Sequence, residues 1–164
     1  IYYLNRNGFS NLPIYLAGIS MGATTVLMAA GLELPACVKG IVADCGFTSP
    51  HSIWKHVAEQ NLHLNYDLHH SWAERLFRRR LHMSAEEAST LSSMEKCQVP
   101  VLFIHGSDDS FVPVEMTYEN YKACAAPKEL LIVPGAGHGL SYPVAPQHYR
   151  DTLRDFFGPE ASAN

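Results

Sequence analysis

Several features that would place the chain outside the globular enzymes are missing from its sequence. No stretch approaches the roughly 20 consecutive apolar residues that a membrane-spanning helix requires, so no membrane span is predicted. The chain has 12 Lys and Arg against 16 Asp and Glu, and its basic residues cluster only at Arg78–Arg80. Because no basic stripe interleaved with aromatic residues is present, no nucleic-acid partner is predicted.

The sequence also lacks the motifs of cofactor sites, metal sites and disulfide frameworks. It has no GxGxxG or HExxH pattern, and its four cysteines are widely spaced without a CxxC pair. No cofactor and no metal are therefore predicted, and the cysteines are interpreted as reduced, largely buried thiols. The chain does have 164 residues, 47% of them hydrophobic, which suffices for the core of one globular domain.

Four short apolar runs predict strands that are buried in a sheet. They cover residues 12–19, 38–43, 99–104 and 129–133. The first, third and fourth runs are followed by segments of helical character, at residues 23–31, 113–124 and 143–157. Strands that alternate with helices predict an α/β fold with a mostly parallel sheet of about four strands and helices on both faces.

The interval between the second and third runs has no strand pattern. Helical patches occur there at residues 53–61, 72–81 and 85–91. We expect this insertion, at about residues 48–96, to form a helical cap over the C-terminal strand ends, within a single domain of residues 1–164.

A serine between two glycines is the first candidate for chemistry. Gly18-Ile19-Ser20-Met21-Gly22 matches G-x-S-x-G, and it lies between a predicted strand and a predicted helix, where this pattern is meaningful. Glycine neighbours let the backbone pack tightly on a strained turn while the Ser20 hydroxyl projects above the sheet. The Met21 N–H would lie at the helix N-terminus and could donate to an oxyanion. We interpret Ser20 as a nucleophile.

Three aspartates are candidates for the catalytic acid. Asp108 and Asp109 follow the third strand run, and Asp44 ends the second. All three would lie at C-terminal strand ends, where open α/β sheets place their active sites. The residues after Asp44 look more like an exit into the cap, which makes it the weaker alternative.

A histidine among glycines follows the last strand run. His138 lies in the sequence GAGHG at residues 135–139, and small neighbours would let its imidazole approach the serine. The chain order Ser20, aspartate, His138 is the order that this type of fold requires of a triad.

Four segments now carry a resemblance to a known family. GISMGA, VADCGFTSP, HGSDDSFVP and GAGH occur in the expected order. With them the chain resembles bacterial α/β hydrolases of the serine aminopeptidase, dienelactone hydrolase and BEM46-like group, over essentially its whole length. The resemblance assigns the acid to Asp109, which occupies the acid position of the pattern H-G-x-x-D-x-x-V-P.

The resemblance implies an acyl-enzyme mechanism with His138 as base and Asp109 as its partner. Our first functional prediction is a carboxylesterase for small or medium esters. The alternatives are a serine peptidase of the aminopeptidase or prolyl oligopeptidase-like type, and a non-catalytic binding protein that keeps the fold.

The start of the chain gives three further expectations. Residues 1–4 read as the last turn of a helix without an initiator Met, so we expect the first strands of the sheet, and a second oxyanion donor, to precede Ile1. The strand at residues 12–19 would then expose an apolar edge that invites self-association. A cytoplasmic location is expected.

Overall fold

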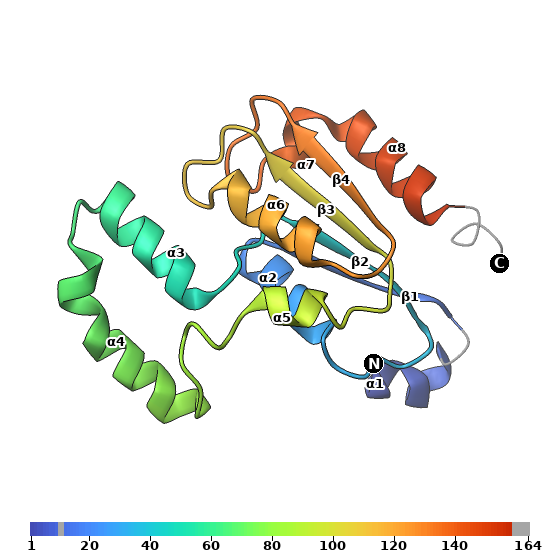
Figure 1. Cartoon of the computed structure of the whole chain (residues 1–164). Coiled ribbons are helices and arrows are strands. Elements are labelled where there is room, and N and C mark those ends of the chain that lie inside the picture. The colour runs from blue at the N-terminus through green and yellow to red at the C-terminus, as the bar shows by residue number, and fades with distance from the viewer. Residues whose placement is uncertain (10–11, 159–164) are drawn as a thin grey trace.

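The sheet of this protein contains four parallel strands in sequence order. The structure is a computed structural model that describes residues 1–9 and 12–158. The strands pair in the order β1-β2-β3-β4, as Figure 1 shows. They are β1 (Ile14–Ile19), β2 (Val38–Asp44), β3 (Val101–Gly106) and β4 (Lys128–Val133). The predicted α/β fold with about four parallel strands is confirmed.

Helices cover both faces of the sheet. Those that pack against the sheet are α2 (Met21–Ala29), α5 (Thr90–Met94), α6 (Val114–Ala123) and α8 (Pro146–Phe157). The other helices of the described residues, where η marks a π-helix, are α1 (Tyr2–Leu4), η1 (Asn5–Phe9), α3 (Pro50–His56), η2 (Val57–Asn61), α4 (Tyr66–Leu81) and α7 (Ser141–Val144). No helix in this part of the chain is long and apolar enough to cross a membrane.

Side chains that alternate along the strands contribute to two hydrophobic cores, one on each face of the sheet. Ile41 and Phe103 point into a core that also contains Leu27 of α2 and Met94 of α5. On the other face, Leu102 belongs to a core that is covered by α8. Because successive side chains on a strand point to opposite faces, a single apolar run serves both layers. Figure 1 shows α8 on one side of the sheet, with α2, α5 and α6 on the other.

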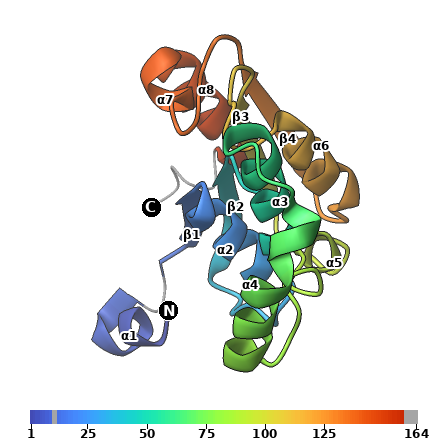
Figure 2. The ribbon, with the colours of Figure 1, turned by 90° about the vertical axis from the view of Figure 1, so that its left-hand side faces the viewer.

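The first strand is not buried as its apolar run predicted, but it does form an edge of the sheet, which was also expected. Its residues are half-buried or exposed, and Ile19 is 56% exposed. The reason is that β1 pairs with β2 alone among the described strands and therefore forms one edge of the sheet, as Figure 2 shows. Self-association through this edge stays a prediction.

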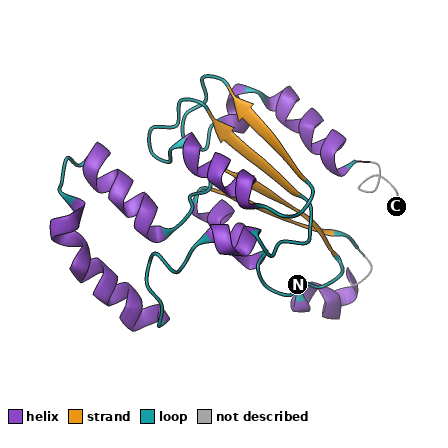
Figure 3. Cartoon of the chain, viewed as in Figure 1, coloured by secondary structure: helices purple, strands orange, loops and turns teal. Residues whose placement is uncertain are grey.

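The insertion between β2 and β3 is helical, and it extends from the sheet as an arm (Figure 3). Ser49 caps α3 by accepting a hydrogen bond from the Ser52 N–H, and Ser49 is followed by Pro50, which suits a first helical turn. The predicted helix at residues 85–91 is wrong, because most of that stretch forms turns and α5 begins only at Thr90. The extent of a cap at about residues 48–96 stays a prediction.

The predicted helix at residues 143–157 is divided into α7 and α8. The break is at Ala145, and α8 starts at Pro146. Proline lacks an N–H and its ring obstructs a continuous helix, but it fits the first turn of a new one.

Candidate active site

The candidate nucleophile lies on a strained turn between β1 and α2. Ser20 has φ 55° and ψ −119°, a backbone conformation that is rare for a residue with a side chain. A Cβ on Gly18 would lie 2.2 Å from the carbonyl carbon and oxygen of Gly22, so this position tolerates only glycine. A Cβ on Gly22 would meet nothing within 4 Å. The expectation that close packing requires both glycines is therefore wrong for Gly22.

Three loops bring the predicted site residues together. His138 Nε2 lies 2.9 Å from Ser20 Oγ, and His138 Nδ1 lies 2.7 Å from Asp109 Oδ2. Ser20 follows β1, Asp109 follows β3 and His138 follows β4, so all three are at the C-terminal ends of parallel strands. This is the geometry of a nucleophile, a base and an orienting acid.

Hydrogen bonds hold Asp109 as an anion. Its Oδ1 accepts from the N–H groups of Phe111 and Val112, both at 2.9 Å. Its Oδ2 faces His138 and also lies 3.2 Å from His105 Nε2. Burial raises the pKa of Asp109, but hydrogen bonds from His105, Val112, His138 and Phe111 outweigh burial and lower this pKa to about 2. The carboxylate is therefore ionised at neutral pH and favours a proton on His138 Nδ1.

The other two aspartates have different partners. Asp108 is exposed and accepts a hydrogen bond from the Ser107 hydroxyl. Asp44 is buried, and its Oδ1 accepts from the Ser141 hydroxyl at 2.9 Å. Within the described residues, the carboxylate that contacts His138 is thus Asp109, as the resemblance implied.

A second histidine, His105, holds the acid loop, which is the loop that carries Asp109. His105 is fully buried, with Nδ1 2.7 Å from Thr117 Oγ1 and Nε2 2.9 Å from the Val112 carbonyl oxygen. These contacts tie the end of β3 to α6 and to the turn that follows Asp109. His105 is therefore a structural partner of the acid.

Two features of the site were missed in the sequence. The ring of Phe111 lies 5.0 Å from the His138 ring, centroid to centroid, and covers part of the imidazole. In the sequence, the only sign of this role was that Phe111 is a large apolar residue inside a polar turn. The second feature is Cys45, which is fully buried and has φ 49°.

Cys45, Asp109 and His138 are the residues in the described part of the chain that could together hold a metal ion. One ligand atom from each lies within 4.8 Å of the others. Burial, followed by the charge of Asp44, raises the pKa of the Cys45 thiol to about 12. A metal ion binds the thiolate form of cysteine, which the raised pKa of Cys45 disfavours. Asp109 and His138 already bind each other, so these two residues fit a triad with Ser20 better than a metal site.

Met21, the predicted oxyanion donor, directly follows Ser20. It is the first residue of α2, so its N–H is one of the groups without a partner inside the helix. The Met21 side chain points to solvent and is 72% exposed. The role of the Met21 N–H as an oxyanion donor stays a prediction.

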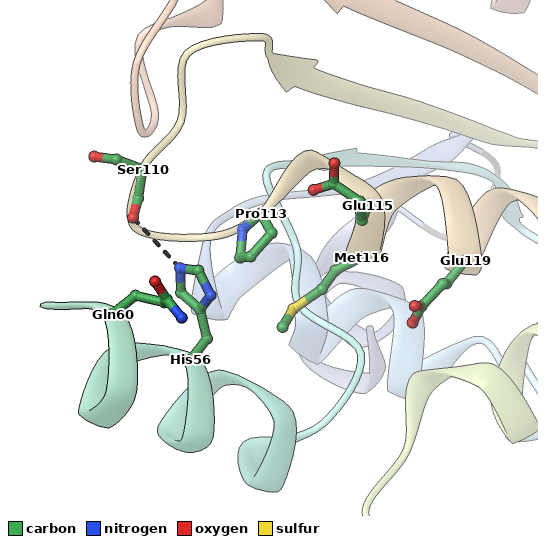
Figure 4. Close-up of a pocket in the computed structure, with 7 residues that line it drawn as sticks. All are labelled: His56, Gln60, Ser110, Pro113, Glu115, Met116 and Glu119. Carbon is green, nitrogen blue, oxygen red and sulfur yellow. Dashed lines mark hydrogen bonds between the residues drawn. The ribbon is translucent and has the colours of Figure 1, made fainter. Parts of the chain in front are cut away.

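A hollow of about 900 Å³ adjoins the acid loop (Figure 4). It lies between the α3–η2 segment and α6, and His56 Nε2 there is 3.5 Å from the Ser110 carbonyl oxygen. The residues that line it are His56, Gln60, Ser110, Pro113, Glu115, Met116 and Glu119. Since Ser20 and His138 are not among them, we assign this hollow no role in the chemistry.

The pKa of Asp109 predicts how acid affects stability. A carboxyl whose pKa is about 2 when folded and 3.8 when unfolded stabilises the fold by about 2 kcal/mol above pH 4. This stabilisation is lost as the pH falls from about 4 to 2. We expect Asp109→Asn to be less stable than the parent chain in urea unfolding at pH 7, with a smaller difference at pH 2.5. The exposed Asp108→Asn is the matched control, and a larger effect of that variant would contradict the assignment.

Comparison with known proteins gives the family. The sequence model of the prolyl oligopeptidase family matches residues 2–162. The chain is 33% identical over 148 residues to the uncharacterized protein YqkD of Bacillus subtilis, a match that covers 87% of this chain and 47% of YqkD. The chain thus spans about half the length of that curated relative.

Solved structures share the fold. The Pyrococcus furiosus esterase Pf2001 matches with a TM-score of 0.65 and 19% identity, over 94% of this chain and 56% of the esterase. A puromycin-hydrolysing peptidase of Mycobacterium tuberculosis matches with a TM-score of 0.70 and 20% identity, over 96% of this chain and 24% of the peptidase. Because the family model matches nearly the whole chain, the protein belongs to the prolyl oligopeptidase family and has the α/β-hydrolase fold.

Proposed function

We propose that this protein is a serine hydrolase that cleaves carboxylic esters through an acyl-enzyme. The observation that carries the proposal is the continuous hydrogen-bonded series from Ser20 Oγ through His138 to Asp109, with distances of 2.9 and 2.7 Å. The strained turn under Ser20 supports the same role, because strain of this kind is found where a side chain must be presented for chemistry.

The geometry supports a two-step reaction. Ser20 Oγ attacks the ester carbonyl carbon while its proton moves to His138 Nε2, and the Met21 N–H donates to the oxyanion that forms. The tetrahedral intermediate then expels the alcohol, which takes the proton from His138. Water attacks the acyl-enzyme with His138 again as base, and the acid product leaves. Throughout, Asp109 holds the His138 tautomer and stabilises the imidazolium.

Hydrolysis of p-nitrophenyl butyrate tests the proposal. The chain should release p-nitrophenol, and Ser20→Ala should lower kcat by several orders of magnitude because the nucleophile is gone. Ser110→Ala is the matched control, because Ser110 directly follows Asp109 but its side chain is exposed and is not part of the triad. Equal activity of the parent chain and Ser20→Ala would refute the proposal.

A peptidase is the second candidate, favoured by the family model and by the likeness to a puromycin-hydrolysing peptidase. Both reactions use the same triad, so the substrate decides between them. We expect kcat/KM for the p-nitrophenyl ester to exceed that for an aminoacyl p-nitroanilide even after each is divided by its uncatalysed rate. The reverse order would favour the peptidase. A folded chain without either activity would favour a non-catalytic binding protein.

A further inference from the structure

A buried carboxylate outside the triad lies at the centre of the site. Asp44 ends β2, the strand between β1 and β3, and it is 1% exposed. Its backbone carbonyl accepts the N–H of Ser20 at 2.8 Å. The end of β2 therefore supports the turn that carries Ser20. The Asp44 side chain itself makes no hydrogen bond with a triad side chain within the described residues.

The Asp44 side chain binds the segment that follows the candidate base. Its Oδ1 accepts from the hydroxyl of Ser141, the fully buried first residue of α7. Tyr149 on α8 lies close enough to the carboxylate for the charge of Asp44 to raise the pKa of Tyr149, after burial as the larger cause. Ser141 comes three residues after His138, so this contact lies at the C-terminal end of the loop with the base.

The N-terminal end of the same loop is held by the two residues that follow β3. The Gly135 N–H donates to Ser107 Oγ at 2.8 Å, and the Asp108 N–H donates to the Ala136 carbonyl at 3.0 Å. The loop that carries His138 is thus anchored on both sides, to the β3 loop before the histidine and to Asp44 after it. Asp44 provides the side-chain anchor to β2.

Stability alone does not account for a carboxyl at this position. Burial raises the pKa of Asp44 more than its hydrogen bond with Ser141 lowers it. Relative to low pH, a carboxyl whose folded pKa is raised makes the fold less stable once the pH exceeds the unfolded pKa, so Asp44 costs stability near neutral pH. Such costs are typical of groups that are kept for the geometry of a site.

We propose that Asp44 is a positioning residue, which holds the His138 imidazole between Ser20 and Asp109 by anchoring the loop that carries His138 through Ser141. This inference rests on the proposed function for its catalytic consequence. Its structural part concerns the His138–Asp109 hydrogen bond, and that part can be measured without any substrate.

The test uses Asp44→Asn and Ser141→Ala, which weaken the same contact from its two sides. Each should lower kcat for p-nitrophenyl butyrate by about 10- to 100-fold, because a small displacement of a reacting group is costly, with KM within about twofold. The double variant should lose little more than either single variant, since both remove one interaction. The downfield proton resonance of His138 Nδ1–H should broaden or vanish in each.

Thr90→Val is the matched control for a general loss of stability. Thr90 is also fully buried, and its hydroxyl contacts Asn120 and the Thr48 carbonyl, which join α5 to other elements. This variant should keep kcat and the His138 resonance. Circular dichroism and urea unfolding establish that each variant is folded under the assay conditions.

The outcomes separate this proposal from the proposed function. Wild-type kcat and an unchanged His138 resonance in folded Asp44→Asn and Ser141→Ala would overturn the positioning role, as would equal losses in Thr90→Val. A parent chain that hydrolyses no ester, but whose His138 resonance still depends on Asp44, would refute the catalytic function and leave the anchoring intact.

Discussion

Replacing His138 with alanine is expected to lower kcat/KM for p-nitrophenyl butyrate by about 10⁴- to 10⁶-fold. The reason is that His138 Nε2 is the base within 2.9 Å of Ser20 Oγ, and without it the hydroxyl stays protonated during attack. The loss should resemble that of Ser20→Ala, and the double variant should be no worse than either single variant, since the residues act as a unit.

Steady-state kinetics with purified variants measures this effect. His148→Ala is the matched control, because His148 is exposed on α8, away from the described contacts of the triad. It should keep kcat/KM within about twofold. A loss of less than about 100-fold in His138→Ala would mean that another group serves as the base.

The second large effect is a loss of stability and of hydrolysis when Gly18 is replaced by alanine. The same replacement at Gly22 should cause no such loss. In Gly18→Ala, the new Cβ would overlap the Gly22 carbonyl at 2.2 Å, so the turn under Ser20 must shift. We expect a loss of about 1–3 kcal/mol in the free energy of unfolding. Hydrolysis should fall at least about 100-fold, because Ser20 is displaced from His138.

Gly22→Ala is the matched control within the same motif. Its Cβ would enter open space, and alanine is the better helix former by about 1 kcal/mol, so this variant should be as stable as the parent chain or more stable. Urea unfolding and ester hydrolysis on both variants measure the contrast. Equal losses at the two positions would contradict the packing of the turn in this structure.

The strands were predictable because each combines a short apolar run with turn residues on either side, whereas their order in the sheet was not predicted. The burial of β1 was not predictable from its own residues, since an apolar run looks the same at the edge and in the centre of a sheet. The break between α7 and α8 had a local signal in Pro146. Pro143 also suits a first helical turn, so a single helix that begins at Pro143 was plausible from the sequence, although Pro143 lies inside α7.

The three site residues were predictable from motif and chain order, and the structure brings their side chains into contact. The choice between Asp108 and Asp109 needed the resemblance, because neighbouring residues in a turn differ only in the direction of their side chains. The link from Asp44 to Ser141 could not be predicted, because it joins residues that are 97 positions apart in the sequence. Phe111 was missed for the same reason, since its partner His138 comes from another loop.

Peptide mapping after exposure to a fluorophosphonate tests the central claim most directly. This reagent forms a covalent adduct only with an activated serine, and the chain contains a control serine, Ser110, in a neighbouring loop. The account predicts one adduct per chain on the peptide with Ser20, which is retained in Ser110→Ala and lost in Ser20→Ala and His138→Ala. A folded chain without an adduct, or with an adduct that remains in Ser20→Ala, would contradict it.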